Sequence, residues 1–265
     1  MTTEALILAV ETSSRVGSVA LARGPVVLAE KVFSAPLQHS AEIFPAISQL
    51  LDRFDCRADS IAQVHIAVGP GSFTGLRIAV TIAKTLHLAN SATIVAVDSL
   101  DVIAANVDDG PCGRPLRNSE AVMDHIAVVL DAKRGEFYAA VYRRADHAAQ
   151  TNETPVAEHR DYEIPAPGDR IWRKIGPDCL TTADELFERF AGQGPLGLVG
   201  DGLLYRRGEF SAEGVHILSP EYWSPRASNV HHLGYQKARA GLFANPLTLT
   251  PFYLRGPHVT LRGRA

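Results

Sequence analysis

The sequence has 265 residues and a mass of 28.6 kDa, and its 46% apolar and 21% charged residues are typical of a folded globular protein of one large or two small domains. With 26 Lys and Arg against 29 Asp and Glu, the net charge of −3 excludes a general basic field that would attract nucleic acid or an anionic membrane. The cysteines Cys56, Cys112 and Cys179 have neither metal-binding spacing nor the even number of a disulfide framework. Glu4 stands where a signal peptide carries Lys or Arg, and no stretch is apolar enough to span a membrane, so we expect a cytoplasmic protein.

The first part of the chain predicts three consecutive strands and then an alternation of helices and strands. Short apolar runs separated by turn residues predict strands at 6–11, 17–22, 26–33, 61–68 and 93–97. Apolar residues at helical spacing predict helices at 40–54, 74–89 and 100–107. The order is therefore β-β-β-α-β-α-β-α.

The second part repeats the beginning of the first. Residues 108–120 are rich in Gly, Pro and charge, which is typical of a linker, so we predict domains at 1–108 and 109–265. Beyond the linker, strands predicted at 126–130 and 137–143 again flank a short polar turn, and LGLVGDGL at 196–203 echoes HIAVGPGS at 65–72. We infer an internal duplication that produces two similar domains facing each other.

Two polar turns follow strands at equivalent places of the repeat. The first, ETSS at 11–14, offers amides and hydroxyls that can cradle a phosphate, although an ordinary polar hairpin is the simpler explanation. Asp131 and Glu136 flank the second turn, and such carboxylates are more often structural or solvated than catalytic.

The glycine-rich segment GPGSFTGLR at 69–77 lies between a predicted strand and a predicted helix. Its glycines permit a sharp turn, and the following helix presents free amides. The third glycine is one residue out of register with a dinucleotide fingerprint, and no Gly-Lys-Ser or Gly-Lys-Thr of a phosphate-binding loop follows. Asp98 ends the next predicted strand, where a dinucleotide-binding fold carries an acidic residue, so a nicotinamide-binding site is a minor alternative.

The helix predicted at 74–89 is apolar around most of its circumference. Its surplus apolar face, around Ile78, Ile82 and Leu86, suggests a partner helix, and burial between a sheet and its own neighbours is the alternative. No zinc-binding histidine spacing occurs, since the adjacent His231 and His232 cannot both face one metal from a helix. No nucleophile motif of a hydrolase is present either.

Seven segments in the same order and spacing resemble the TsaB family, formerly called YeaZ. They are LAVETSSRVGSVAL (8–21), HSAEIFPAI (39–47), AVGPGSFTGLRIAVTIAKTL (67–86), VDSL (97–100), LDAKRGEFYAAVY (130–142), VGDG (199–202) and PFYLR (251–255). The resemblance implies an α/β protein with the duplicated actin-like, sugar-kinase and Hsp70 ATPase-type (ASKHA) fold, in which helices flank two similar mixed five-stranded sheets. It also implies a scaffold or activator subunit, not itself an enzyme, required for threonylcarbamoyl transfer to adenosine 37 of tRNAs that read ANN codons.

The partners implied by the resemblance are a catalytic TsaD-like paralogue, a TsaE-like ATPase and, through the complex, tRNA, with no membrane. Whether the free chain forms a homodimer is left undecided by the sequence. No tightly bound cofactor and no metal are expected, and binding of ATP or ADP in the assembled complex is left undecided by the sequence. The paralogue's histidine pair is absent from VDSLDVIAAN at 97–106, so the chain resembles the non-catalytic partner, for which older descriptions use the label glycoprotease. A stand-alone ATP-dependent, kinase-like enzyme of the same fold is the alternative.

These arguments give four groups of candidate residues. The partner interface comprises His39, Ile43, Ile47, Leu76, Ile78, Ile82 and Leu86. The nucleotide or phosphate loops comprise Glu11, Thr12, Ser13, Ser14, Asp131, Lys133, Gly135, Gly200, Asp201 and Gly202, with Lys133 where the family has arginine. The structural turn comprises Gly69, Gly71 and Gly75. The possible tRNA contacts comprise Arg255, Arg262 and Arg264, in a C-terminal stretch that has no acidic residue after Glu221, although a helix cap followed by a solvated tail is the simpler explanation.

Overall fold

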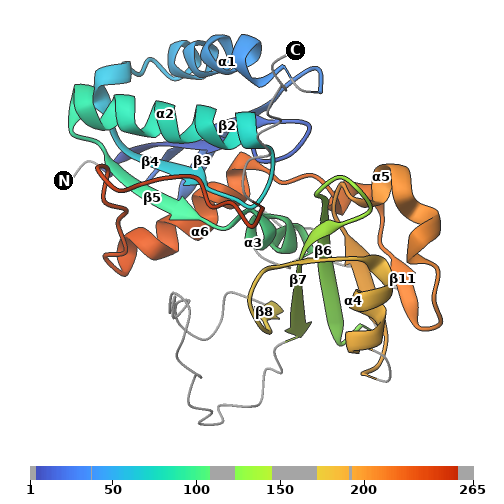
Figure 1. The fold of residues 1–265 in the computed structure, drawn as a ribbon. Coiled ribbons are helices and arrows are strands. Elements are labelled where there is room, and N and C mark those ends of the chain that lie inside the picture. The colour runs from blue at the N-terminus through green and yellow to red at the C-terminus, as the bar shows by residue number, and fades with distance from the viewer. Residues whose placement is uncertain (1–3, 37, 108–122, 145–171, 191–192, 256–265) are drawn as a thin grey trace, which may run out of the picture.

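The chain forms two lobes, each built on one β-sheet (Figure 1). The computed structural model describes residues 4–36, 38–107, 123–144, 172–190 and 193–255. Within these ranges, no helix is both long and apolar enough to cross a membrane.

The first lobe contains a five-stranded sheet in the order β3-β2-β1-β4-β5. Its strands are β1 (Leu6–Glu11), β2 (Ser18–Arg23), β3 (Val26–Val32), β4 (Ile61–Ala67) and β5 (Thr93–Val97). Strands β1, β2 and β3 form the predicted antiparallel meander, and β4 and β5 join β1 in parallel. Helices α1 (His39–Arg53) and α2 (Phe73–Asn90) pack on one face of this sheet.

The second lobe repeats this topology. Its sheet has the order β11-β10-β6-β7-β8, and β9 also pairs with β7. The strands are β6 (His125–Asp131), β7 (Phe137–Arg144), β8 (Trp172–Lys174), β9 (Cys179–Thr181), β10 (Leu196–Val199) and β11 (Val215–Ile217). The antiparallel pair β6–β7 and the parallel neighbours β10 and β11 correspond to β1–β2, β4 and β5, so the predicted duplication is confirmed. The expectation of five strands in each sheet is wrong here, because β8 and β9 pair with different parts of the long β7 and make six.

Two helices cross between the lobes. Helix α3 (Ser99–Ala104) follows β5 in the chain, but Leu100 and Ile103 pack in the core of the second lobe. Helix α6 (Ala227–Arg239) follows the second sheet and covers the face of the first sheet opposite α1 and α2. The domain boundary predicted near 108 falls outside the described residues and stays a prediction. Helices α4 (Ala183–Phe190) and α5 (Leu203–Arg206) complete the second lobe.

The fold is therefore, as expected, that of an α/β protein in which helices flank two mixed sheets of the same topology. This topology decides which loops meet. The segments that follow β1, β6 and β10 meet at the junction between the lobes, since Asp201 accepts from the backbone N–H groups of Arg15 and Asp131.

Candidate functional site

In the turn that follows β1, the side chain of Glu11 binds the polar groups of the turn. The backbone N–H and the Oγ–H of Ser13 donate to Glu11 Oε1 at 2.5 and 2.6 Å. Glu11, Ser13 and Ser14 are all buried. A carboxylate thus sits where a phosphate would sit in a cradle of free amides, so this turn is not an open phosphate site.

Burial makes Glu11 an unusual carboxyl group. Loss of hydration raises its pKa from 4.5 to about 7, the negative charge of Asp201 adds to the effect, and the hydrogen bonds from Ser13 oppose it. Its Oε2 atom has no hydrogen-bond partner among the described residues. Glu11 therefore contributes stability below pH 4.5 that is lost as the pH rises through 7.

Replacing Glu11 by glutamine should remove this pH dependence. Between pH 5 and pH 8, the free energy of unfolding of Glu11→Gln should rise relative to the wild type by about 2.5 kcal/mol, because only the wild type develops a buried charge. Urea denaturation at the two pH values measures this change, with Glu188→Gln on the exposed side of α4 as the matched control. An equal stability difference at both pH values would contradict the assignment.

The equivalent turn of the second lobe is closed in the same way. The backbone N–H of Lys133 donates to Asp131 Oδ1 at 2.8 Å, and Lys133 Nζ lies 2.5 Å from Asp131 Oδ2. Burial acts to raise the pKa of Asp131, but the bonds from Lys133 outweigh it and lower the pKa below its ordinary value. In both lobes, therefore, an acid at the end of a strand accepts from the amide two residues on.

Asp201 connects the two lobes. Its loop reaches the junction because Gly200 has φ +119° and a Cβ there would lie 2.2 Å from Val129 O, and because the Gly202 N–H donates to Val129 O at 3.1 Å. The Asp201 carboxylate accepts from the backbone N–H of Arg15 in the first lobe. Burial raises the pKa of Asp201 to about 6, and the charge of Asp131 adds to this.

The glycine-rich loop packs against the first turn instead of facing an anion. The Ser72 N–H donates to Ser13 O at 2.7 Å, and the Thr12 hydroxyl donates to Gly75 O at 2.7 Å. A Cβ at Gly69 would lie 2.3 Å from Phe252 O, and a Cβ at Gly71 would lie 2.3 Å from Ser13 O. The contacts of the loop are thus those of a structural turn.

Asp98 does not have the position that the nicotinamide alternative requires. Its Oδ1 accepts from the Leu100 N–H at 2.8 Å and caps α3, and its Oδ2 lies 3.1 Å from Lys174 Nζ. The same ammonium contacts Asp101 at 3.0 Å and Asp178 at 2.6 Å. Sequence reasoning missed this buried cluster, because its members are up to 80 residues apart and only the packing of α3 on the second lobe brings them together.

Arg255 has partners within its own chain. Its Nη1 donates to Ala132 O at 2.6 Å, and its Nη2 pairs with Glu136. The preceding residues lie on the first lobe, where the Phe252 N–H donates to Val68 O at 2.7 Å. Residues 252–255 therefore bridge the lobes, and the expected tRNA contact of Arg255 stays a prediction. Arg262 and Arg264 lie outside the described residues.

The candidate interface on α1 and α2 is only partly at the surface. His39, Ile43, Leu76 and Ile82 are buried within the chain, because α1, α2 and the first sheet cover one another. Their assignment to an exposed interface is therefore corrected. Ile47, Ile78 and Leu86 are half-buried, and Phe44 on α1 is 65% exposed. Sequence reasoning missed Phe44 because it lies between two core positions of the helical pattern.

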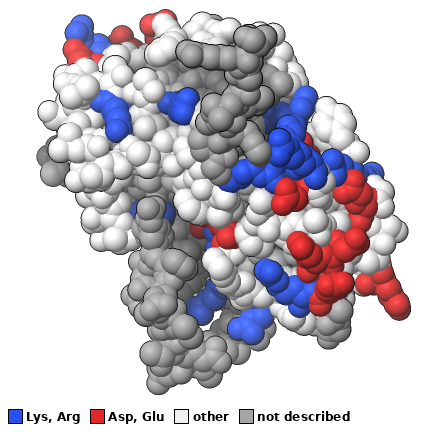
Figure 2. Space-filling view, viewed as in Figure 1, with Lys and Arg blue, Asp and Glu red and all other residues white. Residues whose placement is uncertain are grey.

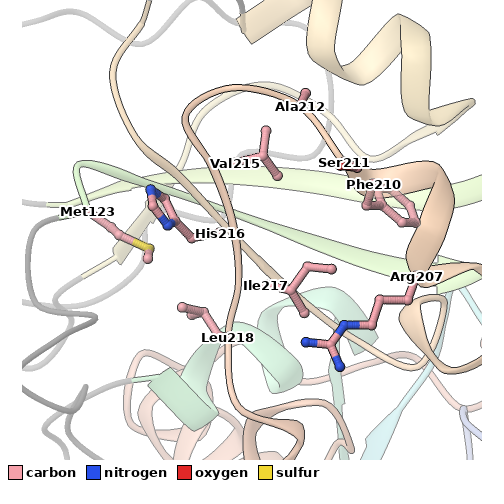
Figure 3. A pocket seen from close by; sticks show the side chains of 9 residues that line it. All are labelled: Met123, Arg207, Phe210, Ser211, Ala212, Val215, His216, Ile217 and Leu218. Carbon is pink, nitrogen blue, oxygen red and sulfur yellow. The ribbon is translucent and has the colours of Figure 1, made fainter.

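An open pocket of about 490 Å³ lies beside β11 in the second lobe (Figure 3). Met123, Phe210 and Leu218 are buried residues of its lining, and Arg207 and His216 lie on opposite sides of it. It shares no residue with the turns at the lobe junction, and nothing in its lining points to a particular chemistry. The described residues contain no group of three or more His, Cys, Asp or Glu suited to hold a metal ion.

Comparison with known proteins places these features in a family context. Residues 33–162 match the family model of TsaD, tRNA N6-adenosine threonylcarbamoyltransferase. The chain is 36% identical over 137 residues to the tRNA threonylcarbamoyladenosine biosynthesis protein TsaB of Bacillus subtilis, covering 52% of this chain and 55% of that protein. It is 30% identical over 151 residues to TsaB of Escherichia coli, covering 57% and 61% respectively. The matches thus span little more than half the length of these relatives.

The solved structure of YeaZ from Pseudomonas aeruginosa shares the fold. It superposes with a TM-score of 0.69 at 20% identity and covers 94% of this chain and 100% of that chain. The molecule is thus an α/β protein with two mixed sheets that shares its fold with YeaZ. The chain is thus similar in sequence to TsaB proteins and to the TsaD family model, and similar in fold to YeaZ.

Proposed function

We propose that this chain is a non-catalytic scaffold or activator subunit in the formation of threonylcarbamoyladenosine on tRNA. The proposal starts from the printed names of its relatives, which are biosynthesis proteins for this modification. The observation that carries the non-catalytic role is the closure of both turns at the lobe junction by Glu11 and Asp131. Because each acid already accepts from an amide of its own turn and a negative carboxylate there would repel a phosphate, we propose that the chain binds no nucleotide tightly.

The partner that best fits this role is a TsaD-like catalytic subunit, with a TsaE-like ATPase joining the complex in the cytoplasm. Helices α1 and α2 pack side by side on the outside of the first lobe. Phe44 and Ile47 on α1 and Ile78 and Leu86 on α2 are apolar residues that this chain covers incompletely. Exposed aromatic residues are frequent anchors of protein interfaces.

Co-purification with the TsaD-like subunit, followed by an assay of tRNA modification with and without this chain, tests the proposed function. We expect modification only when both subunits and the ATPase are present, and none with this chain alone. Threonylcarbamoyl transfer by the purified single chain would overturn the non-catalytic role.

Replacing Phe44 by aspartate should weaken association with the catalytic subunit about a hundredfold, because burying an unpaired carboxylate costs roughly 3 kcal/mol or more. The fold should remain intact, since Phe44 is 65% exposed. Leu88→Asp is the matched control, because Leu88 is 84% exposed at the far end of α2. Isothermal titration calorimetry of both variants measures the effect, and equal affinities for the two would remove Phe44 from the interface.

A kinase-like enzyme of the same fold is the second candidate. It is favoured by one observation, the approach of two buried carboxyl groups, Glu11 and Asp201, from opposite lobes. Titration with ATP and magnesium separates the two functions: micromolar binding by the isolated chain would support the enzyme and argue against the scaffold.

A further inference from the structure

Three segments that are far apart in the sequence form one basic rim at the lobe junction. Arg15 follows β1, Lys133 and Arg134 belong to the turn between β6 and β7, and Tyr205 and Arg206 belong to α5. The guanidinium carbon of Arg15 lies 5.2 Å from the centre of the Tyr205 ring, which links the first lobe to α5. The Arg206 guanidinium packs beside Gly135, which links α5 to the turn. We call these five residues the junction rim.

The junction rim is positively charged although the protein is acidic. Figure 2 shows Lys and Arg gathered in a band where the second lobe meets the first, with carboxylates on the flank beyond it. Three of the cations pair with surface carboxylates: Lys133 with Asp131, Arg255 with Glu136, and Arg206 with Glu209. Glu11 and Asp201 lie beneath the rim, and burial raises the pKa of both toward neutrality, which reduces their negative charge.

The rim also offers a flat aromatic surface. The Tyr205 residue is 73% exposed, which is high for a large apolar side chain, and the Arg15 guanidinium lies over its ring. A tyrosine paired with arginine and surrounded by further cations matches what single-stranded RNA requires, since bases stack on aromatic faces and phosphates pair with guanidinium and ammonium groups. Protein interfaces are also enriched in tyrosine and arginine, so an acidic protein partner is the alternative that a competition experiment must exclude.

We propose that the junction rim is a binding surface for single-stranded RNA, with a base stacked at Tyr205 and phosphates contacted by Arg15, Lys133 and Arg206. The inference rests on the proposed function, in which tRNA is the substrate of the complex, and it gives this chain a direct RNA contact. The tRNA contact expected of Arg255, which binds Ala132 O beside the rim, stays a separate prediction.

Fluorescence anisotropy with the full chain and a labelled RNA hairpin that has a single-stranded loop tests the surface. Tyr205→Ala should weaken binding about tenfold, within the range measured for the loss of one base stack, and Tyr205→Phe should retain the wild-type affinity. Arg15→Gln should reduce the slope of log affinity against log salt concentration by about 0.7, the value for one lost contact to a single strand. Arg57→Gln, with the same change of charge at an 82% exposed side chain in the first lobe, should leave affinity and slope unchanged.

Three results would overturn the inference. They are undetectable binding of the hairpin by the wild type at low salt, equal binding by Tyr205→Ala and the wild type, and displacement of the hairpin by polyglutamate as readily as by unlabelled hairpin, which would indicate an acidic protein partner. The co-purification with the catalytic subunit contains no RNA step. A failure of the junction rim is therefore distinguishable from a failure of the proposed function.

Discussion

Replacing Gly75 by alanine is expected to destabilise the first lobe by roughly 4 kcal/mol or more. A Cβ at this position would lie 1.8 Å from Thr12 O, a backbone atom that cannot rotate away. The same turn is fixed from both sides, because the Thr12 hydroxyl donates to Gly75 O and the Ser72 N–H donates to Ser13 O. The added methyl group would therefore separate α2 from the turn that follows β1.

Gly208→Ala is the matched control for this substitution. No atom lies within 4 Å of a Cβ at Gly208, so the control should change the free energy of unfolding by less than about 1 kcal/mol. Urea denaturation followed by circular dichroism measures both variants. A Gly75→Ala protein as stable as Gly208→Ala would show that the turn and α2 do not pack as described.

The sequence predicted the first lobe well because its elements are long and regular. Strands Leu6–Glu11 and Thr93–Val97 were predicted at their observed bounds, and α2 extends one residue beyond the prediction at each end. In the second lobe, β8, β9 and β11 have three residues each and were missed. A run of three residues is too short for its alternation to be distinguished from a loop.

The candidate site was predicted only in part, for a physical reason. Periodicity shows that a residue such as Ile82 faces something apolar, but it cannot tell whether the neighbour is the sheet of the same chain or another protein. The motifs at Glu11 and Asp131 were likewise found from the duplication, whereas their closure depends on side-chain hydrogen bonds that no spacing reveals. The bridge made by Arg255 depends on the return of the chain across both lobes after α6.

A buried pair of histidines between β4 and α6 gives the first lobe a weakness at acid pH. The rings of His65 and His231 are stacked, with centroids 5.5 Å apart and an angle of 11° between their planes. Both residues are buried, and three of their four ring nitrogens have no hydrogen-bond partner among the described residues. Burial lowers the pKa of His65 to about 3, with a further contribution from the charge of His231, and burial lowers the pKa of His231 to about 4.

Acidification should therefore weaken the packing of α6 on the sheet. Above pH 6.5 both histidines are neutral in the folded and the unfolded chain, and they impose no pH-dependent cost. Below pH 6.5 both histidines become protonated in the unfolded chain but stay neutral in the folded chain. At pH 5 each histidine therefore lowers the free energy of unfolding by about 2 kcal/mol. Glu11 and Asp201 act in the opposite direction over the same range, which hides the effect in the wild type alone.

Comparison of variants isolates the contribution of the pair. On acidification from pH 7.5 to pH 5, the free energy of unfolding of the wild type should fall by about 4 kcal/mol more than that of the double variant His65→Leu, His231→Leu. Any packing cost of the leucines is the same at both pH values and cancels from this difference. His216→Leu, which changes an exposed histidine on β11, should follow the wild type. Urea denaturation at the two pH values provides the measurement, and hydrogen exchange should place the acid-induced opening in α6 and β4. A double variant with the same pH dependence as the wild type would show that the two rings are charged or hydrated in the folded chain.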